Sequence, residues 1–243
     1  DSAIRLPVQA HPDKAFSHKY FNSPYGKEES WYILATRPGG KVFYGFKDGV
    51  TMEQFEKAIE ESENSKTVME NLLESFEVKP GDVIYIPAKM VHAIGAGCLL
   101  LEVQEPTDFT IQPERWCGDY RLNDNEMYLG IGKKSALECF DVGMKYPAPI
   151  EPVLVGGEDG MKYYSLIDER MTTSFSVRRA ELRGGSFKLN RGAAIYVVTE
   201  GEGKLTGYGY EKDVKKGDYF FIPVAAKGKF TVSGNADVVE CYR

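Results

Sequence analysis

The chain repeats one pattern twice, and this repeat constrains its fold more than any other feature. Residues 32–46 (YILATRPGGKVFYGF) and 196–210 (YVVTEGEGKLTGYGY) each read as two alternating strands joined by a glycine-rich turn, which is typical of a β-hairpin. Residues 81–87 (GDVIYIP) and 217–223 (GDYFFIP) form a second matched pair in the same order. The sequence therefore predicts an all-β-dominated protein made of two copies of one β-sheet unit.

The two copies differ by a helical insertion in the first, near residues 51–75. Thr51 is a good N-cap residue, and Gln54 follows it at the spacing of a capping box. Apolar residues recur after them at helical spacing. A second short helix is predicted around residues 67–73, after a polar break.

The connection between the copies is rich in turn-forming residues. It runs over residues 106–160, with a possible helix near 133–139 and three prolines within 147–152. Prolines and glycines mark a linker more often than the inside of a sheet. We therefore place the first unit at residues 1–142 and the second at 143–243.

Charge and composition exclude several classes of partner. The net charge is −6 and the isoelectric point is about 5.3, with no basic stripe, which argues against nucleic acid and anionic membranes. No apolar run approaches the roughly 20 residues of a membrane span. Four cysteines without a C-x-x-C pair predict reduced thiols. We expect a cytoplasmic protein that acts on a small molecule.

The chain begins with Asp1 instead of Met, and residues 4–11 already read as a strand. A strand at the start of a chain lacks the neighbours that would pair with it. We expect the sequence to be part of a longer chain.

Four side chains from separate segments have the chemistry of a metal site. Gln9 and His11 lie two positions apart on a predicted strand, so they project from one face. Glu29 precedes a strand, and His92 follows the turn after the strand of residues 81–87. Two imidazoles, one carboxylate and one amide suit one divalent ion such as zinc, with ligand distances of about 2.0–2.2 Å, and other divalent metals also fit. A single anionic ligand leaves the ion positively charged, as a Lewis acid requires.

Each of these residues alone has an ordinary structural explanation. A lone histidine is more often structural than a ligand, and His18, in a polar stretch, is interpreted that way. Together, however, the residues favour a metal site over separate structural roles. The combined pattern is Q-x-H on one strand, a glutamate before another, and then GD-x5-P-x4-H. The last spacing resembles the second sequence motif of the cupin fold.

Three strings carry a resemblance to one family. LPVQAHPD (6–13), YGKEESWYIL (25–34) and KPGDVIYIPAKMVHAIGAG (79–97), followed by LLLEVQEPTD, are similar to type I mannose-6-phosphate isomerase (phosphomannose isomerase) in its short bacterial form, of the cupin superfamily. The resemblance is strong over residues 1–110 and weaker beyond them. It implies two cupin-like, jelly-roll β-barrels, and strands before Gln9 that this chain lacks.

The resemblance also implies a zinc enzyme that interconverts mannose 6-phosphate and fructose 6-phosphate. The family's metal ligands correspond to Gln9, His11, Glu29 and His92. Its active-site lysine corresponds to Lys27, and an acidic residue beyond the last histidine corresponds to Glu102. In such a reaction a proton moves between C2 and C1 through a cis-enediol. Lys27 or a metal-bound water would polarise O1 or assist ring opening, and Glu102 would act as the base if it points inward.

Two departures from the family pattern concern the substrate. Pro7 stands where the family usually has serine, and Gln112 stands where it usually has an arginine used for the phosphate or the reaction. A planar arginine fork suits phosphate, and glutamine does not replace it. Arg115, Arg121 or Arg5 would then have to supply the cation, so the candidate substrate-binding residues are Arg115, Gln112 and Arg5.

The second copy lacks this metal site. Matching the GD motifs puts Gly228 at the place of His92, and matching Tyr196 with Tyr32 puts Ala193 at the place of Glu29. No histidine follows His92. We expect the second unit to pack against and wall the pocket.

Two rival functions stay open. One is a metal-binding cupin with a sugar-binding or regulatory role, or an isomerase for an unphosphorylated sugar, which Pro7 and Gln112 favour. The other is a cupin oxygenase or decarboxylase, whose sites commonly present three histidines and one glutamate. The sequence does not determine the native metal or the oligomeric state.

Overall fold

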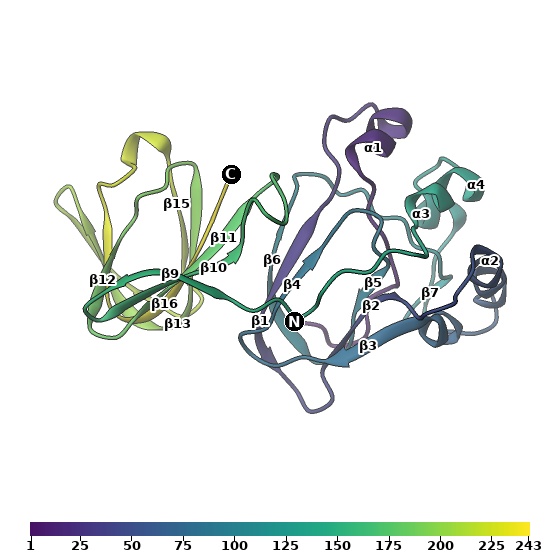
Figure 1. Ribbon diagram of the computed structural model, residues 1–243, viewed down its shortest axis with the longest axis horizontal. Coiled ribbons are helices and arrows are strands. Elements are labelled where there is room, and N and C mark those ends of the chain that lie inside the picture. Colours follow the sequence, from purple (N-terminus) through teal and green to yellow (C-terminus); the bar gives the residue numbers. More distant parts are fainter. The chain divides into compact units, whose positions relative to one another are not determined.

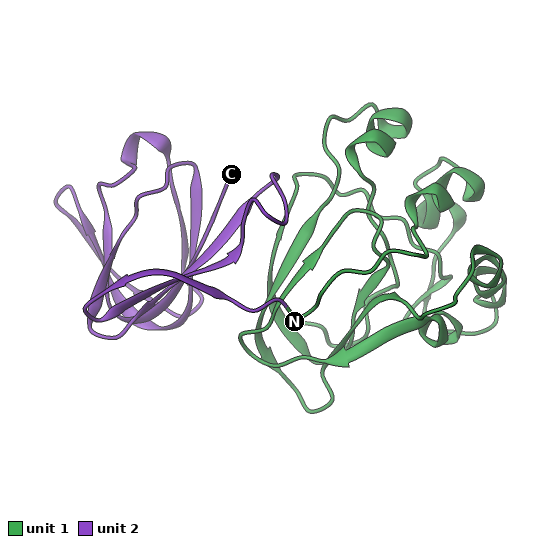
Figure 2. Cartoon of the chain, viewed as in Figure 1, with its two compact units in different colours: residues 1–149 green, residues 150–243 purple.

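The computed structural model describes residues 1–243 as two compact units, Asp1–Pro149 and Ile150–Arg243 (Figure 2). The break between them lies in the proline-rich segment, a few residues after the boundary that the sequence placed at 142/143.

The first unit is built on two three-stranded antiparallel sheets (Figure 1). The first sheet has the order β4 (Val83–Ile86), β1 (Glu29–Thr36), β6 (Cys98–Gln104). The second has the order β3 (Leu73–Glu77), β2 (Lys41–Phe46), β5 (His92–Ile94). Single bridges continue the second sheet from His92 to Gln9 and from Ala10 to Ile111. A separate two-stranded ribbon joins β7 (Trp116–Cys117) and β8 (Tyr120–Arg121).

One core cluster of this unit lies between the two sheets, and a second packs β2 and β5 against the helices. Trp31 and Ile33 alternate along β1 and are buried together with Ile84 and Ile86 of β4. Val42 of the other sheet belongs to the same cluster. Because side chains on one face of a strand recur every second residue, Glu29 projects from the same face as Trp31, toward the space between the sheets.

Short helices lie at one end of the first unit, as Figure 1 shows. They are α1 (Lys14–Phe21), α2 (Met52–Glu61), η1 (Val68–Leu72), α3 (Asp124–Tyr128), α4 (Lys133–Ala136) and η2 (Leu137–Cys139). The predicted capping box of α2 is confirmed, because Thr51 and Gln54 bond each other's backbone N–H. Helix α1, which Asp13 caps, has no counterpart among the helices expected from the sequence. No helix of the chain is long and apolar enough to cross a membrane.

The second unit is a single eight-stranded antiparallel sheet. Its order is β14 (Tyr210–Lys215), β13 (Ala194–Gly207), β16 (Thr231–Tyr242), β11 (Ser176–Leu182), β10 (Met161–Ile167), β9 (Val153–Glu158). Two more strands pair off this path, β12 (Gly185–Lys188) with β16 and β15 (Tyr219–Ile222) with β13, and η3 (Val224–Ala226) follows β15.

The chain is thus mostly β, but its hydrogen bonds close neither unit into a barrel. In the second unit the sheet path ends at β14 and β9, and every residue of β9 is exposed. Strands at an open edge have no further partner, so the two closed barrels expected from the sequence are not seen as closed sheets.

Strand register corrects the alignment of the two copies. Trp31 pairs with Ile84, and Tyr196 pairs with Phe220, the residue that matches Ile84 in the second GD motif. Tyr196 is therefore equivalent to Trp31 and not to Tyr32.

The same shift moves the position that corresponds to Glu29. Glu29 pairs with Ile86, and Ala194 pairs with the matching Ile222. Ala194, not Ala193, stands at the place of Glu29. Neither alanine side chain offers a metal ligand, so the difference leaves the second unit without this carboxylate.

The capping box gives a stability prediction. Thr51→Ala removes the side-chain acceptor for the N–H of Gln54, so the first unit should lose about 1 kcal/mol of unfolding free energy. Both tryptophans, Trp31 and Trp116, lie in that unit, so tryptophan fluorescence during urea unfolding measures it selectively. Thr51→Ser keeps the acceptor and should stay close to wild type; an equal loss in both variants would contradict the capping role.

Candidate metal centre

His11, Glu29 and His92 meet in the space between the two sheets of the first unit. Glu29 opens β1, His92 opens β5, and His11 follows the bridged residues Gln9 and Ala10 (Figure 1). All three side chains are buried, and their candidate ligand atoms lie within 4.8 Å of one another. Three of the four residues predicted as ligands therefore lie close together.

Backbone carbonyls orient both imidazole rings. Nδ1 of His92 lies 2.8 Å from the carbonyl oxygen of Met90, and Nδ1 of His11 lies 3.0 Å from that of Phe109. A carbonyl only accepts, so each Nδ1 carries the proton and donates. The unprotonated Nε2 of each ring then faces the centre, an arrangement that is usual for metal-bound histidines.

The centre gathers hydrogen-bond acceptors against one another. Nε2 of His11 lies 3.1 Å from Oε2 of Glu29, and Nε2 of His92 lies 3.3 Å from Oε1. His92 Nε2 and Glu29 Oε2 are both buried without a hydrogen-bond partner. Acceptors at this separation repel unless a cation lies between them, and buried unpaired polar atoms are costly. The donor set therefore fits a metal ion.

The protonation state of His11 fits a metal ligand. Burial lowers the pKa of His11 to about 4, so its ring is neutral at pH 7. Metal ligands must be deprotonated, and a neutral imidazole meets that condition.

Gln9 occupies the edge of this centre. Its backbone exchanges two hydrogen bonds with His92, of 3.0 and 2.9 Å. Residues that face each other in an antiparallel pair project to the same side, so the half-buried side chain of Gln9 starts beside His92. Its role as fourth ligand stays a prediction.

Lys27 and Trp31 are the donors that reach the centre. The ammonium of Lys27 is buried, 3.1 Å from Nε2 of His11 and 3.2 Å from Oε2 of Glu29. The indole N–H of Trp31 donates to Oε1 of Glu29 at 3.1 Å. Sequence reasoning named Lys27 but missed Trp31, although its position two residues after Glu29 on one strand face was the available signal.

Glu102 lies on the strand face that carries Glu29. It pairs with Trp31 across β1 and β6, so it projects from that face. The residue as a whole is exposed, but its carboxyl group is largely withdrawn from water, and this burial, followed by the negative charge of Glu29, raises the pKa of Glu102. The role of Glu102 as the base stays a prediction.

Gln112 lies next to the isolated bridge that joins Ala10 to Ile111. On the other side of Ile111, Thr110 Oγ1 lies 3.5 Å from Nδ1 of His11. Strand alternation predicts that the side chain of Gln112 projects to the side of Gln9.

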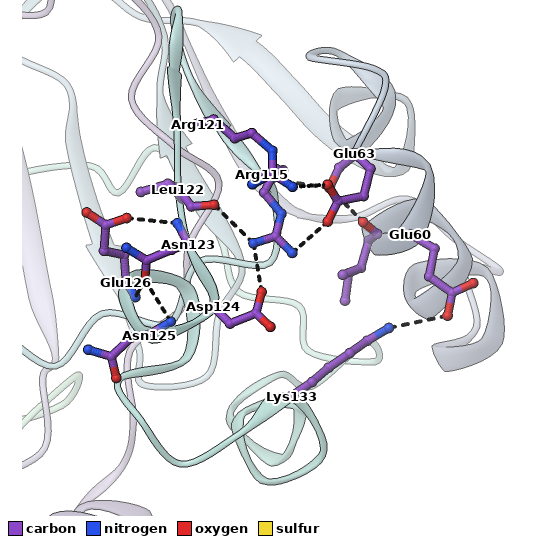
Figure 3. Close-up of polar contacts among 12 residues, drawn as sticks. Glu60, Glu63, Arg115, Arg121, Leu122, Asn123, Asp124, Asn125, Glu126 and Lys133 are labelled. Carbon is purple, nitrogen blue, oxygen red and sulfur yellow. Dashed lines mark hydrogen bonds and ion pairs between the residues drawn. The ribbon is translucent and has the colours of Figure 1, made fainter.

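The three arginines considered for phosphate binding are held by carboxylates. Arg115 contacts Glu63 at 2.6 Å and Asp124 at 2.8 Å, and Arg121 contacts Glu63 at 2.5 Å (Figure 3). Arg5 is bound by two acids, Glu114 at 2.6 Å and Glu70 at 2.8 Å. These ion pairs neutralise the guanidinium groups, so a phosphate would have to compete for them. Separately, His18 is exposed on α1, outside the centre.

Comparison with known proteins agrees with this geometry. Mannose-6-phosphate isomerase ManA of Bacillus subtilis is 31% identical over 255 residues, which cover 100% of this chain and 72% of that protein. The chain belongs to the mannose-6-phosphate isomerase family. Residues 169–243 match the family's model "Mannose-6-phosphate isomerase, cupin domain". The resemblance inferred from the sequence is thereby confirmed.

Two further relatives support the family assignment. Mannose-6-phosphate isomerase of Streptococcus mutans is 27% identical over 243 residues, covering 98% of this chain and 70% of that protein. The crystal structure of mannose 6-phosphate isomerase from Bacillus subtilis has a TM-score of 0.80 at 25% identity, covering 100% of this chain and 73% of that one. The family relationship thus extends across both units.

The orphaned acceptors give a binding prediction. His92→Ala should weaken Zn²⁺ binding to the metal-free chain by at least about 100-fold, since loss of even an outer hydrogen-bond partner of a ligand costs about 10–100-fold. His18→Ala, on the exposed face of α1, is the matched control and should bind one Zn²⁺ per chain like wild type. Titration calorimetry measures both. Equal zinc affinity in the two variants would contradict the assignment of the centre.

Proposed function

We propose that this chain is an isomerase that interconverts mannose 6-phosphate and fructose 6-phosphate with one divalent metal bound by Gln9, His11, Glu29 and His92. The proposal rests on the buried acceptor atoms of His11, Glu29 and His92. These atoms converge, and two of them, His92 Nε2 and Glu29 Oε2, have no hydrogen-bond partner. Relatives named mannose-6-phosphate isomerase support the substrate.

Zinc is the metal we propose, because two imidazole nitrogens and two oxygens suit it, and its positive charge would stabilise an oxyanion that develops on the sugar. We also propose that each unit is a cupin-type jelly roll, a fold built from facing sheets that need not close by hydrogen bonds. The two facing sheets around the centre support this for the first unit.

Glu102 is the proposed base. Isomerisation removes the proton from C2 of the open-chain aldose and returns it to C1, through a cis-enediol. The carboxylate of Glu102 projects from the strand face that carries Glu29, and its raised pKa brings it closer to the operating pH, where a general base is most effective. The proton that Glu102 takes from C2 is the one that it delivers to C1, while a second proton moves from O2 to O1 and completes the exchange.

Lys27 has a different role in this scheme. Its ammonium lies against His11 and Glu29, inside the centre, so it carries a positive charge where O1 or O2 of the sugar would lie. A fixed cation there would donate to the sugar oxygen that becomes negative during proton removal. Lys27 would also assist ring opening by donating to the ring oxygen or O1.

One observation favours a second candidate, an isomerase for an unphosphorylated sugar. Arg5 and Arg115 are neutralised by acids, and strand alternation predicts that Gln112 projects to the side of Gln9. An amide donates to and accepts from a hydroxyl, whereas it offers a phosphate no charge. We retain Gln112, Arg115 and Arg5 as candidate substrate contacts, with Gln112 favoured by its position.

The function is tested by turnover. Metal-free protein supplied with zinc, cobalt or manganese should form fructose 6-phosphate from mannose 6-phosphate. A coupled assay measures the rate of this conversion. Mannose under the same conditions should react with a kcat/KM lower by about tenfold or more, because a bound phosphate contributes charge-assisted hydrogen bonds of about 1.5–3 kcal/mol each. Faster turnover of mannose would establish the second candidate, and no turnover of either sugar with any metal would remove the isomerase proposal.

The base is tested separately. Glu102→Gln should lower kcat by about 10²–10⁴-fold, the range of general acid–base catalysis, while zinc binding stays unchanged. Glu74→Gln, an exposed residue of β3, is the control and should keep wild-type kcat. A Glu102→Gln enzyme with wild-type kcat would assign the proton transfer to another group.

A further inference from the structure

The second unit contains a cavity of its own, of about 360 Å³. That volume lies within the range of about 300–1,000 Å³ that is usual for small-molecule sites. The residues that line it include Tyr163, Phe187, Lys188, Asn190, Arg191 and Glu240, all within unit two. The proposed isomerase centre uses none of them.

The repeat relates this cavity to the centre of the first unit. Glu102 pairs with Trp31 across neighbouring strands, and Glu240 pairs with Tyr196, the equivalent of Trp31. Glu240 therefore stands at the register position of Glu102. The second copy has Ala194 at the position that corresponds to Glu29, but it has a carboxyl group at the position of Glu102.

Two tyrosines hold the carboxylate of Glu240. The residue is 1% exposed, and it accepts hydrogen bonds from the hydroxyl of Tyr196 at 2.8 Å and from that of Tyr163. Burial and the charge of Glu240 raise the pKa of both tyrosines, so their hydroxyls stay protonated and donate. A carboxylate has about four acceptor positions, so this pair leaves some of its capacity free.

A buried carboxylate contributes little to the stability of a fold. Taking the charge out of water costs several kcal/mol, and well-packed apolar residues are often at least as stable in its place. The cavity next to Glu240 supplies another reason for the charge, since a molecule bound there would donate to the acceptor positions that the tyrosines leave.

The rest of the lining defines the chemistry of such a molecule. Lys188 and Arg191 balance the two acids Glu158 and Glu240, so the site has no net charge for an anion. The rings of Tyr163 and Phe187, with centroids 5.3 Å apart, form an apolar wall. An apolar wall with a few acceptors and donors suits a molecule with both C–H faces and hydroxyl groups.

We propose that this cavity binds a neutral monosaccharide or a similar polyhydroxylated molecule, with Glu240 accepting from its hydroxyl groups and Arg191 and Asn190 donating to them. Arg191 is already oriented, because its guanidinium lies 4.4 Å from the centroid of the Tyr242 ring. This binding requires no metal and is independent of the proposed isomerase reaction.

The test uses the full chain with the His92→Ala substitution, which disables the metal centre, and D-mannose as the probe in ligand-observed NMR. Saturable binding should be present. Glu240→Gln and, separately, Arg191→Ala should each weaken it by about tenfold, the loss of one charge-assisted hydrogen bond. Arg170→Ala is the matched control, because Arg170 is an exposed arginine of the same unit that pairs with Asp168, and it should leave binding unchanged.

Three results would overturn the proposal. The first is the absence of saturable D-mannose binding, and the second is binding that neither Glu240→Gln nor Arg191→Ala weakens. The third is a preference of about tenfold or more for mannose 6-phosphate over D-mannose that Arg191→Ala removes, which would make the site an anion site. Circular dichroism checks the fold of each variant, and if Glu240→Gln does not fold, Arg191→Ala decides.

Discussion

Three buried acceptor groups face one another in the first unit. Two imidazole nitrogens and a carboxylate converge between two sheets, where Nε2 of His92 and Oε2 of Glu29 have no hydrogen-bond partner. Such an arrangement is unfavourable by itself, because buried unpaired polar atoms cost free energy. Lys27 offsets part of the repulsion, and a divalent cation would offset the rest. The centre is therefore built for a positive charge, and the sheets hold it in place.

The surroundings of the centre divide into groups that hold it and groups that face solvent. Met90 and Phe109 orient the histidines through backbone carbonyls, and Trp31 donates to Glu29. Glu102 is exposed on the same face. By contrast, Arg115 and its acidic partners form a network beside α2 and α3 that fixes local structure (Figure 3). Arg115 is therefore already paired with acids, and a substrate would have to displace them to use its charge.

The second unit keeps the strand register of the candidate metal centre without its candidate ligands. Ala194 and Gly228 stand at the positions that correspond to Glu29 and His92, and Glu240 keeps the register of Glu102 beside a cavity. Strand pairing keeps a side chain at the same register position even when the residues around it differ. This is because side chains alternate along a strand, so the register determines to which face of the sheet each one projects.

The sequence by itself determined the features that depend on local spacing: the two copies, the capping box at Thr51, and the common face of Gln9 and His11, which follows from the period of a strand. The family motifs also predicted that Glu29 and His92 belong to one site, and the two residues lie close together in the structure. Only the tertiary structure decided that Tyr196 matches Trp31, that Gln9 pairs with His92, and that the arginines are paired with acids. Strand register and ion pairing join residues far apart in the chain, and they depend on the packing of the whole unit, which no local pattern records.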